Sequence, residues 1–400
     1  MRPHTLDDQL VLSPVKSHIT GSVFPKITGG KAASALAIQY QLNHSQWWKP
    51  EKMRAHQFQQ VRALLYHAIK HVPLYQDLYQ STGITEKTRI DGYAFSSLPI
   101  LSRQVLQENP AEIISNQLAD IHGHARRVHT SGSTGRPVQI QMSELSTRMW
   151  HSFTFREHLW FKRDFSKKLA AIRYVPHGMA GIKENVHTNG WGPSTDIAYQ
   201  TGPAALLNSN VDIRDQAKWL IDINPEYLMS HPSNIQALAE HFIENRLCVP
   251  NLIEIRSHGE PVTEKLRSLC QQAWGCGLTD IYSTVEVGYI ALQCPKHNHY
   301  HIQSEGIYVE ILNDDGHPCQ PGEIGRVIVT PLHNYASPLI RYEVGDYAEV
   351  GEPCDCGRTL PVIKRILGRV RNMVKLPDGS QIWPEFGYAD FENIMKIKQL

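Results

Sequence analysis

Hydrophobic residues recur at intervals of three and four positions in an early part of the chain, residues 56–72. The residues that carry this pattern are Val61, Leu64, Leu65, Ala68, Ile69 and Val72. Because this spacing places them on one face of a helix, we predict an amphipathic helix that packs on the core.

From residue 169 to residue 286, short apolar runs alternate with stretches of helical spacing. The apolar runs are LAAIRY, EYLMSH, LIEIRS and GLTDIYS, and the helical stretches are DQAKWLIDI, NIQALAEHFI and TEKLRSLCQQAW. Strands that alternate with helices at this spacing predict parallel β-α units in a layered α/β region.

After residue 300, turn-rich segments separate the apolar runs GIYVEIL, GRVIVT and DYAEVG. Short apolar runs separated by turn-rich segments predict a mostly antiparallel, β-rich region.

The composition is that of a soluble globular protein, with 41% hydrophobic and 20% charged residues. The 40 Lys and Arg residues nearly balance the 39 Asp and Glu residues, so we expect neither a nucleic-acid nor a membrane partner. The sequence has no signal-peptide pattern and no apolar run long enough to span a bilayer, which favours a cytoplasmic location. There the seven cysteines would stay reduced, and clusters among them suggest metal binding.

The segment TSGSTGRP is rich in glycine and hydroxyl residues, and it lies between Val128 and the alternating positions Val138, Ile140 and Met142. A Walker loop requires GxxxxGK[ST] with a helix directly after it, and this segment fails both conditions. We therefore predict the tip of a β-hairpin whose glycines and hydroxyls bind a polyphosphate. A polar turn without a ligand is the alternative.

TSGSTGRP resembles the phosphate loop of adenylate-forming enzymes, the superfamily of acyl-CoA synthetases and nonribosomal adenylation domains. Four further segments resemble motifs of that superfamily, in its order: SHGEPVTEKLR, YSTVEVG, RYEVGD and GRVRNM. Two longer segments, HAIKHVPLYQDLYQSTGI and PLIRYEVGDYAEVGEPCDCGRTLPVIKRILGR, resemble the phenylacetate-CoA ligase family in particular. The resemblance covers roughly residues 60–400, and five motifs in order make it specific.

The resemblance implies an α/β (α+β composite) fold with a large adenylate-forming N-terminal domain at residues 1–367. A hinge and the truncated start of a small C-terminal domain follow at residues 368–400. Within the large domain we expect a helical part at 1–125, an α/β core at 126–290 and a β-rich part with a metal site at 291–367. Relatives continue into a small domain that carries a lysine needed for adenylation. We therefore expect that this chain is truncated or that a separate chain supplies this function.

Members of the superfamily let a carboxylate attack the α-phosphate of ATP and then transfer the acyl group to a thiol or an amine. Because two anions must meet, positioning and charge neutralisation matter more than a protein nucleophile. The resemblance assigns catalytic roles to Thr130, Arg136, Glu286 and Arg369, with Glu286 as the Mg²⁺ ligand. It assigns nucleotide contacts to Ser131, Gly132, Ser133, Thr134, Gly135, Gly259, Glu260, Pro261, Tyr282, Ser283, Thr284 and Asp346.

Among these residues, the resemblance implies that Asp346 accepts hydrogen bonds from the ribose hydroxyls and that Tyr282 lies near the adenine. Arg136 stands where many relatives carry lysine, and it keeps the charge. Val285 is a departure, because relatives usually have a threonine or serine there that contacts phosphate. The adjacent Thr284 could take over that contact. For Glu286, an exposed charge after a strand is the alternative interpretation.

Two cysteine- and histidine-rich segments, CPKHNHYH from Cys294 and CDC at residues 354–356, could converge on one metal ion. Zinc takes four such ligands in structural sites. We predict zinc binding by Cys294, His301, Cys354 and Cys356. His297 or His299 could replace His301, and reduced side chains without a metal are the alternative.

The predicted function is ATP-dependent, AMP-forming activation of an aryl or acyl carboxylic acid, followed by transfer to CoA. The implied cofactors are ATP, Mg²⁺ and structural Zn²⁺. Two alternatives remain open: transfer to an amine or a carrier-protein thiol, and a nucleotide-binding module without catalysis. A homodimer is a further expectation. Trp160, Phe161 and Tyr174 are candidates for the acid pocket, with core packing as the alternative.

Overall fold

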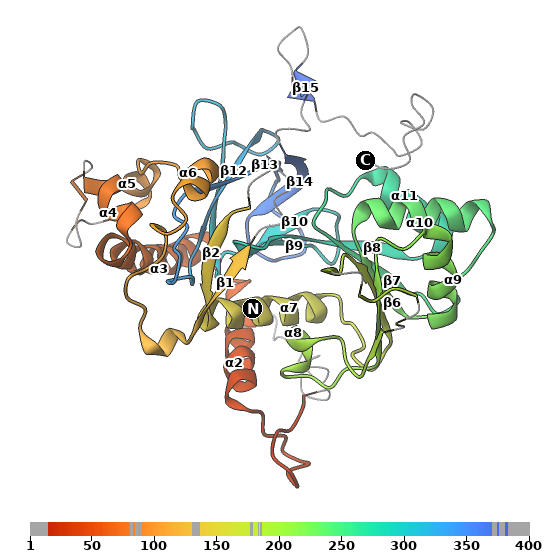
Figure 1. Cartoon of the computed structure of the whole chain (residues 1–400). Coiled ribbons are helices and arrows are strands. Elements are labelled where there is room, and N and C mark those ends of the chain that lie inside the picture. The colour runs from red at the N-terminus through yellow and green to blue at the C-terminus, as the bar shows by residue number, and fades with distance from the viewer. Residues whose placement is uncertain are drawn as a thin grey trace.

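The computed structural model describes residues 15–369 apart from short gaps, together with residues 374–375 and 381–382 (Figure 1). The gaps are residues 81–82, 85–87, 89, 130–136, 177–178, 183 and 185. A 12-stranded mixed sheet forms the framework, in the order β11-β12-β13-β14-β10-β9-β8-β7-β6-β3-β5-β4. At its middle, β8 pairs parallel with β7 and antiparallel with β9. No described helix is long and apolar enough to cross a membrane.

One half of the sheet is parallel and carries the predicted β-α units. Its strands are β3 (Leu169–Arg173), β5 (Ala204–Asn208), β6 (Tyr227–Ser230), β7 (Glu254–His258) and β8 (Gly277–Thr284), with β4 (Val186–Thr188) antiparallel at the edge. The helices between these strands are α9 (Ile213–Ile223), α10 (Pro232–Glu244) and α11 (Glu264–Trp274). All three predicted helices and all four predicted strands are present, so the prediction of a layered α/β region is confirmed.

Helices α9 and α11 begin and end at residues that suit helix termini. The side chains of Asp212 and Thr263 each accept a hydrogen bond from a main-chain N–H of the first turn. The helices end at Asn224 and Gly275, whose φ angles of 45° and 69° are left-handed and stop the helix. The local sequence therefore sets where each β-α unit turns back toward the sheet.

The other half of the sheet is antiparallel, as predicted for the chain after residue 300. Its strands are β9 (Gly288–Gln293), β10 (Tyr300–Ile302), β11 (Ile307–Leu312), β12 (Ile324–Pro331), β13 (Tyr342–Val350) and β14 (Val362–Arg369). Both halves belong to one continuous sheet. The domain boundary that we expect at residue 290 falls inside β9, and the sheet continues across it.

N-terminal helices share a core with this antiparallel half. They are α3 (Pro50–His71), α4 (Pro73–Gln80), α5 (Gly92–Ser96) and α6 (Arg103–Glu108). The predicted amphipathic helix is confirmed as α3, which begins six residues earlier than the pattern because Pro50 can occupy its first turn. Its apolar face is buried against the sheet. The N-terminal part of the chain is therefore held against the strands that carry the candidate site.

A separate hairpin of β1 (Ala125–His129) and β2 (Gln139–Ser143) precedes α7 (Glu144–Trp160). The two strands pair antiparallel, with Val128 opposite Ile140, as the alternation predicts. The segment between them, residues 130–136, lies outside the described residues. Helix α2 (Gly30–Ser45) packs on α7. The remaining elements are η1 (Asp120–His122), α8 (Pro193–Asp196), β15 (Val374–Lys375) and β16 (Gln381–Ile382).

Candidate active site

Glu286 lies in the turn that joins β8 to β9, where the sheet changes from parallel to antiparallel. The Val287 N–H donates to the Thr284 hydroxyl at 3.2 Å, which fixes this turn. The Glu286 side chain is 3% exposed, and its Oε1 lies 3.5 Å from Arg103 Nη1. The Tyr342 hydroxyl donates to the same oxygen at 3.4 Å. Such partners offset the cost of burying a carboxylate.

Asp346 lies on β13, directly opposite Arg369 on β14. Its side chain is 9% exposed, and Oδ1 lies 3.0 Å from Arg369 Nε. The Tyr282 hydroxyl donates to Oδ2 at 2.9 Å. Arg369 also donates to the Val344 carbonyl at 2.7 Å, which holds the guanidinium in place. Strand register therefore brings together three of the predicted site residues from three strands.

The two carboxylates belong to one charged cluster. Burial raises the pKa of the Asp346 carboxyl, and the nearby charge of Glu286 raises it further. Arg369, the Tyr282 hydroxyl and Arg103 lower that pKa. Burial and the charge of Asp346 raise the pKa of Tyr282 well above its usual value, so this hydroxyl stays protonated and can donate. The negative charges of the two carboxylates are balanced by the positive charges of two guanidinium groups. A bound cation could replace a guanidinium group, and a bound anion could replace a carboxylate.

The loop predicted to frame the adenine approaches the end of β14 next to this cluster. A Cβ atom at Gly368 would lie 2.9 Å from Pro261 Cγ, so the glycine permits the contact. Gly259 has a φ of 84°, a left-handed angle that glycine adopts without strain. Glu260 accepts hydrogen bonds from the N–H of Ser233 at 2.8 Å and from its hydroxyl at 3.1 Å, at the first turn of α10.

The predicted phosphate-binding residues from Thr130 to Arg136 lie outside the described residues, so their roles stay predictions. Ser283 is half-buried near the end of strand β8, and Val285, which follows that strand, is 50% exposed. The hydroxyl of Thr284 accepts from the Val287 N–H, which leaves its own proton available to donate. Thr284 therefore lies at the start of the turn that holds Glu286, and its phosphate contact stays a prediction.

A small cavity of about 30 Å³ adjoins Glu286 on the side of α7. Its lining includes Met149, Trp150, Phe153 and Tyr289. The acid-pocket candidates Trp160, Phe161 and Tyr174 are placed elsewhere. The ring centroid of Trp160 lies 5.8 Å from that of His301, Phe161 lies beside a separate groove, and Tyr174 is 61% exposed.

Sequence reasoning missed two partners of Glu286, Arg103 and Tyr342. Arg103 opens helix α6, far from the motifs, and reaches the site because β13 lies beside this segment. The Leu101 N–H donates to the Arg341 carbonyl at 2.9 Å, which fastens the two segments together. Tyr342 begins β13 inside a recognised motif, yet the motif gave no reason to select its hydroxyl. No local pattern marks either residue, because the contact exists only after folding.

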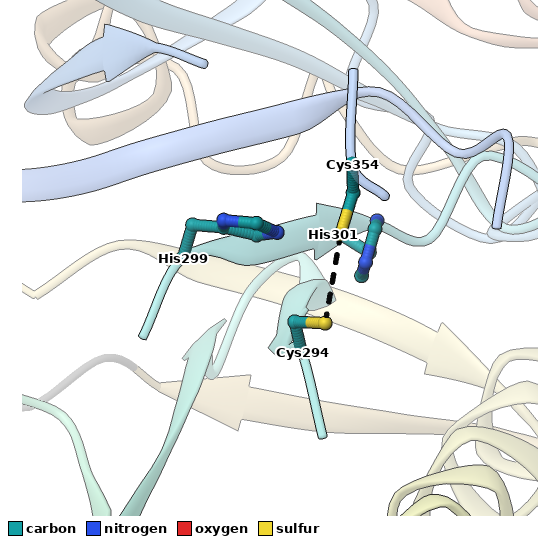
Figure 2. Close-up of side chains that lie close together, drawn as sticks. All are labelled: Cys294, His299, His301 and Cys354. Carbon is teal, nitrogen blue, oxygen red and sulfur yellow. Dashed lines mark hydrogen bonds between the residues drawn. The ribbon is translucent and has the colours of Figure 1, made fainter. Parts of the chain in front are cut away.

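A second cluster joins the two cysteine- and histidine-rich segments (Figure 2). Cys294 Sγ and Cys354 Sγ are 3.8 Å apart, and Cys356 Sγ is 3.4 Å from His301 Nε2. His299 also has a ring nitrogen within 4.8 Å of the donor atoms of Cys294, His301 and Cys354. His297 lies 2.5 Å from Asp355 Oδ1 and has a ring nitrogen within 4.8 Å of Cys354 Sγ. The fold therefore brings together the predicted ligands Cys294, His301 and Cys354 with His299, and it places the fourth predicted ligand, Cys356, beside His301.

The side chains of this cluster differ in protonation, and burial raises the pKa of the Cys294 thiol. Burial lowers the pKa of His301 to about 4, so the imidazole is neutral at pH 7. Burial raises the pKa of Cys354 to about 12, whereas N–H donors of Arg358 help to bring that of Cys356 below its usual value. Main-chain N–H groups of Lys296 and Cys356 donate to Cys294 Sγ and Cys354 Sγ. Such donors stabilise a thiolate, the form that binds metal.

No family model matches the chain. Among curated proteins, it is similar to the phenylacetate-coenzyme A ligase of Thermus thermophilus, with 27% identity over 84% of this chain and 74% of the relative. The Escherichia coli phenylacetate-coenzyme A ligase is 25% identical over 88% of this chain and 79% of that protein.

Solved structures agree on the fold. The structure of 2-hydroxyisobutyryl-CoA ligase in the postadenylation state has a TM-score of 0.67 and 17% identity, and the match covers 84% of this chain and 72% of that one. The same enzyme in its thioesterification state has a TM-score of 0.66 and 18% identity, over 87% of this chain and 74% of that one. The resemblance predicted from the motifs is confirmed: the chain is a homologue of phenylacetate-coenzyme A ligases and has the fold of adenylate-forming CoA ligases.

Proposed function

We propose that this protein uses ATP to activate a carboxylic acid as an acyl-adenylate and then transfers the acyl group to coenzyme A. The observation that carries the proposal is the single cluster of Glu286, Asp346, Arg103 and Arg369 at the switch between the sheet halves. The chain's similarity to phenylacetate-coenzyme A ligases supports the same reaction. The charged cluster suits a nucleotide, and the cavity next to it suits the acid, so the two substrates would lie side by side.

In the first step, a carboxylate oxygen of the acid bonds to the α-phosphorus of ATP, and pyrophosphate leaves. In the second step, the thiolate sulfur of coenzyme A bonds to the acyl carbon, and AMP leaves. Both steps bring anions together, so we assign charge control to the side chains of the cluster. Asp346 accepts hydrogen bonds from the ribose hydroxyls, and Arg369 stays paired with it.

Glu286 is the proposed ligand of Mg²⁺, a cation that prefers carboxylate and phosphate oxygens. Mg²⁺ supplies charge neutralisation at the phosphates when it is bound. The site fits such an ion because Glu286 is buried and, within the described part of the chain, its side chain is held by an arginine at 3.5 Å and a tyrosine at 3.4 Å. These contacts are long enough to be exchanged for a metal bond. The predicted loop from Thr130 to Arg136 completes the proposed phosphate site.

The first test is acid-dependent exchange of labelled pyrophosphate into ATP by the purified protein, across a panel of aliphatic and aromatic acids. We expect exchange with at least one acid and loss of exchange in Glu286→Gln. Glu264→Gln is the matched control, because Glu264 is 79% exposed and its partners among the described residues, Arg267 and Asn298, are not members of the cluster. Tight ATP binding without exchange for any acid would contradict the proposal and favour a nucleotide-binding module.

The acyl acceptor is tested separately by adding coenzyme A to the active mixture and detecting the thioester by mass spectrometry. We expect a coenzyme A thioester together with AMP. An amide formed from an added amine, with no thioester, would contradict the second step while leaving the first step intact.

We further propose that Cys294, His301, Cys354 and Cys356 bind a structural zinc ion. Tetrahedral zinc holds neighbouring sulfur and nitrogen ligand atoms roughly 3.5 to 3.8 Å apart, as its usual bond lengths require. The separations of 3.8 Å between two sulfurs and 3.4 Å between sulfur and imidazole fit this geometry. One zinc per chain is expected by elemental analysis of protein purified without chelators. A metal-free preparation that is fully folded would contradict this assignment.

A further inference from the structure

Among the described residues that line the cavity beside Glu286, Asn334 alone has a buried side-chain atom without a hydrogen-bond partner. Asn334 is 5% exposed, and its Oδ1 is buried without a hydrogen-bond partner among the described residues. None of the other described lining residues has such an atom. A buried acceptor without a donor costs free energy, so its presence on a residue that lines the cavity points to a ligand that supplies the donor.

The hydrogen bonds of Asn334 fix the orientation of its amide. Nδ2 donates to the Gln141 carbonyl at 2.9 Å and to the Ser337 carbonyl at 3.1 Å. An inverted amide would set an oxygen against these two carbonyl oxygens, so Oδ1 cannot exchange places with Nδ2. Oδ1 is therefore the amide atom with unused hydrogen-bonding capacity, and it can only accept a hydrogen bond.

The walls of the cavity limit the size of the ligand. The ring centroids of Trp150 and Tyr289 are 4.6 Å apart, and the Tyr289 hydroxyl lies 3.1 Å from Thr154 Oγ1. A Cβ atom at Gly306 would lie 2.5 Å from Phe153 Cε2, so backbone and ring are already in close contact there. The free volume of about 30 Å³ has room for about two water-sized groups. A short chain fits this space without displacing the aromatic side chains.

We infer that the substrate is a short carboxylic acid whose chain carries a hydrogen-bond donor, a hydroxyl or an amino group, and that Asn334 Oδ1 accepts from it. The inference rests on the proposed function, because it places the acid in the cavity that Glu286 adjoins. Asn334 then determines specificity. An acid with a methyl group in place of the donor leaves Oδ1 unpaired and is selected against.

The test compares acids of equal shape that differ only in a hydroxyl or a methyl group: lactate with isobutyrate, and 3-hydroxybutyrate with 3-methylbutyrate. Phenylacetate tests the size limit. We expect kcat/KM in pyrophosphate exchange to favour the hydroxy acid by about tenfold to a hundredfold in at least one pair, and phenylacetate to be poorer than that acid. Equal values in both pairs, or phenylacetate as the best acid, would overturn the inference.

Variants assign the preference to a residue. In Asn334→Leu, the ratio of hydroxy to methyl acid should fall to near one. In Met149→Ala, which enlarges the same cavity, larger acids should gain relative to lactate while the hydroxyl preference persists. A preference that survives in Asn334→Leu would show that another group reads the hydroxyl, and it would refute the role of Asn334.

If no acid supports exchange, the proposed function fails, and direct binding then decides the inference. Saturation-transfer NMR with wild-type protein measures each acid pair without turnover. Stronger binding of the hydroxy acid would support Asn334 as the acceptor. Equal binding within both pairs would overturn it independently of the reaction.

Discussion

The charged cluster and the Cys/His cluster draw on the same two stretches of chain, residues 282–301 and 342–369, and Arg103 joins only the charged one. In the charged cluster, Glu286 and Asp346 are buried, while their partners Arg103 and Arg369 are 18% and 28% exposed. In the Cys/His cluster, Cys294 Sγ lies 3.8 Å from Cys354 Sγ, and Cys356 Sγ lies 3.4 Å from His301 Nε2. Partners that reach solvent can be exchanged for a ligand, whereas converging donors close around one ion. The difference is consistent with the two proposed roles, catalysis at the charged cluster and structural metal binding at the Cys/His cluster.

Breaking the Cys/His cluster should have the largest effect on stability. Cys354→Ser removes one proposed ligand, and because binding of a structural metal contributes to folding free energy, we expect a loss on the order of 5 kcal/mol. Thermal unfolding together with zinc analysis measures it. Cys319→Ser is the matched control, since Cys319 lies outside the cluster and should change stability by about 1 kcal/mol or less. Equal stability of both variants would mean that the cluster binds no structural metal.

Glu286→Gln should have the largest effect on catalysis while leaving the Cys/His cluster intact. Glutamine keeps the shape but loses the charge that holds Mg²⁺, so we expect pyrophosphate exchange to slow by about 100- to 1000-fold, or roughly 3 to 4 kcal/mol. Zinc content should stay at the wild-type level. Unchanged exchange at saturating Mg²⁺ would remove Glu286 from the active site.

Asp346→Ala should weaken ATP binding by about 1.5 to 3 kcal/mol through the loss of charge-assisted hydrogen bonds to the ribose. The measurement is calorimetric titration with ATP, and with 2′-deoxy-ATP as a comparison. Wild-type protein should prefer ATP, and the variant should distinguish the two nucleotides less. Asp215→Ala, at an exposed position, serves as the control. An unaltered ATP affinity would show that the ribose lies elsewhere.

Arg103→Gln should have the smallest effect, slowing pyrophosphate exchange by about 1 kcal/mol or less at pH 8. The variant tests whether Arg103 acts through its charge or through its packing. Arg103 lowers the pKa of Asp346, so its removal raises that pKa. Because the ionised carboxylate is the active form, activity in the variant should then be lost at a higher pH as the solution is acidified. Arg103→Lys keeps the charge and should restore the wild-type profile. If wild-type protein, Arg103→Gln and Arg103→Lys all lose activity at the same pH on acidification, the charge of Arg103 has no role in the site.

Much of the fold follows from local sequence. Alternating runs and helical spacing predict the β-α units and the antiparallel strands, and Asp212 and Gly275 mark helix ends. The motifs also predict Glu286, Asp346, Tyr282 and the four cysteine and histidine ligands, which the fold brings together. These features depend on neighbouring residues or on resemblance, so they can be recognised before the chain folds.

Only the tertiary structure decided which side chains complete each site. Arg103 reaches Glu286, and Asn334 lines the cavity, through contacts between distant segments that carry no local pattern. The union of both strand regions in one sheet likewise depends on β8 and β9 pairing at its middle. Hydrophobic periodicity records which face of an element is buried, but not which element covers it. Partner choice is set by the summed packing of the whole chain, and no short stretch of sequence contains it.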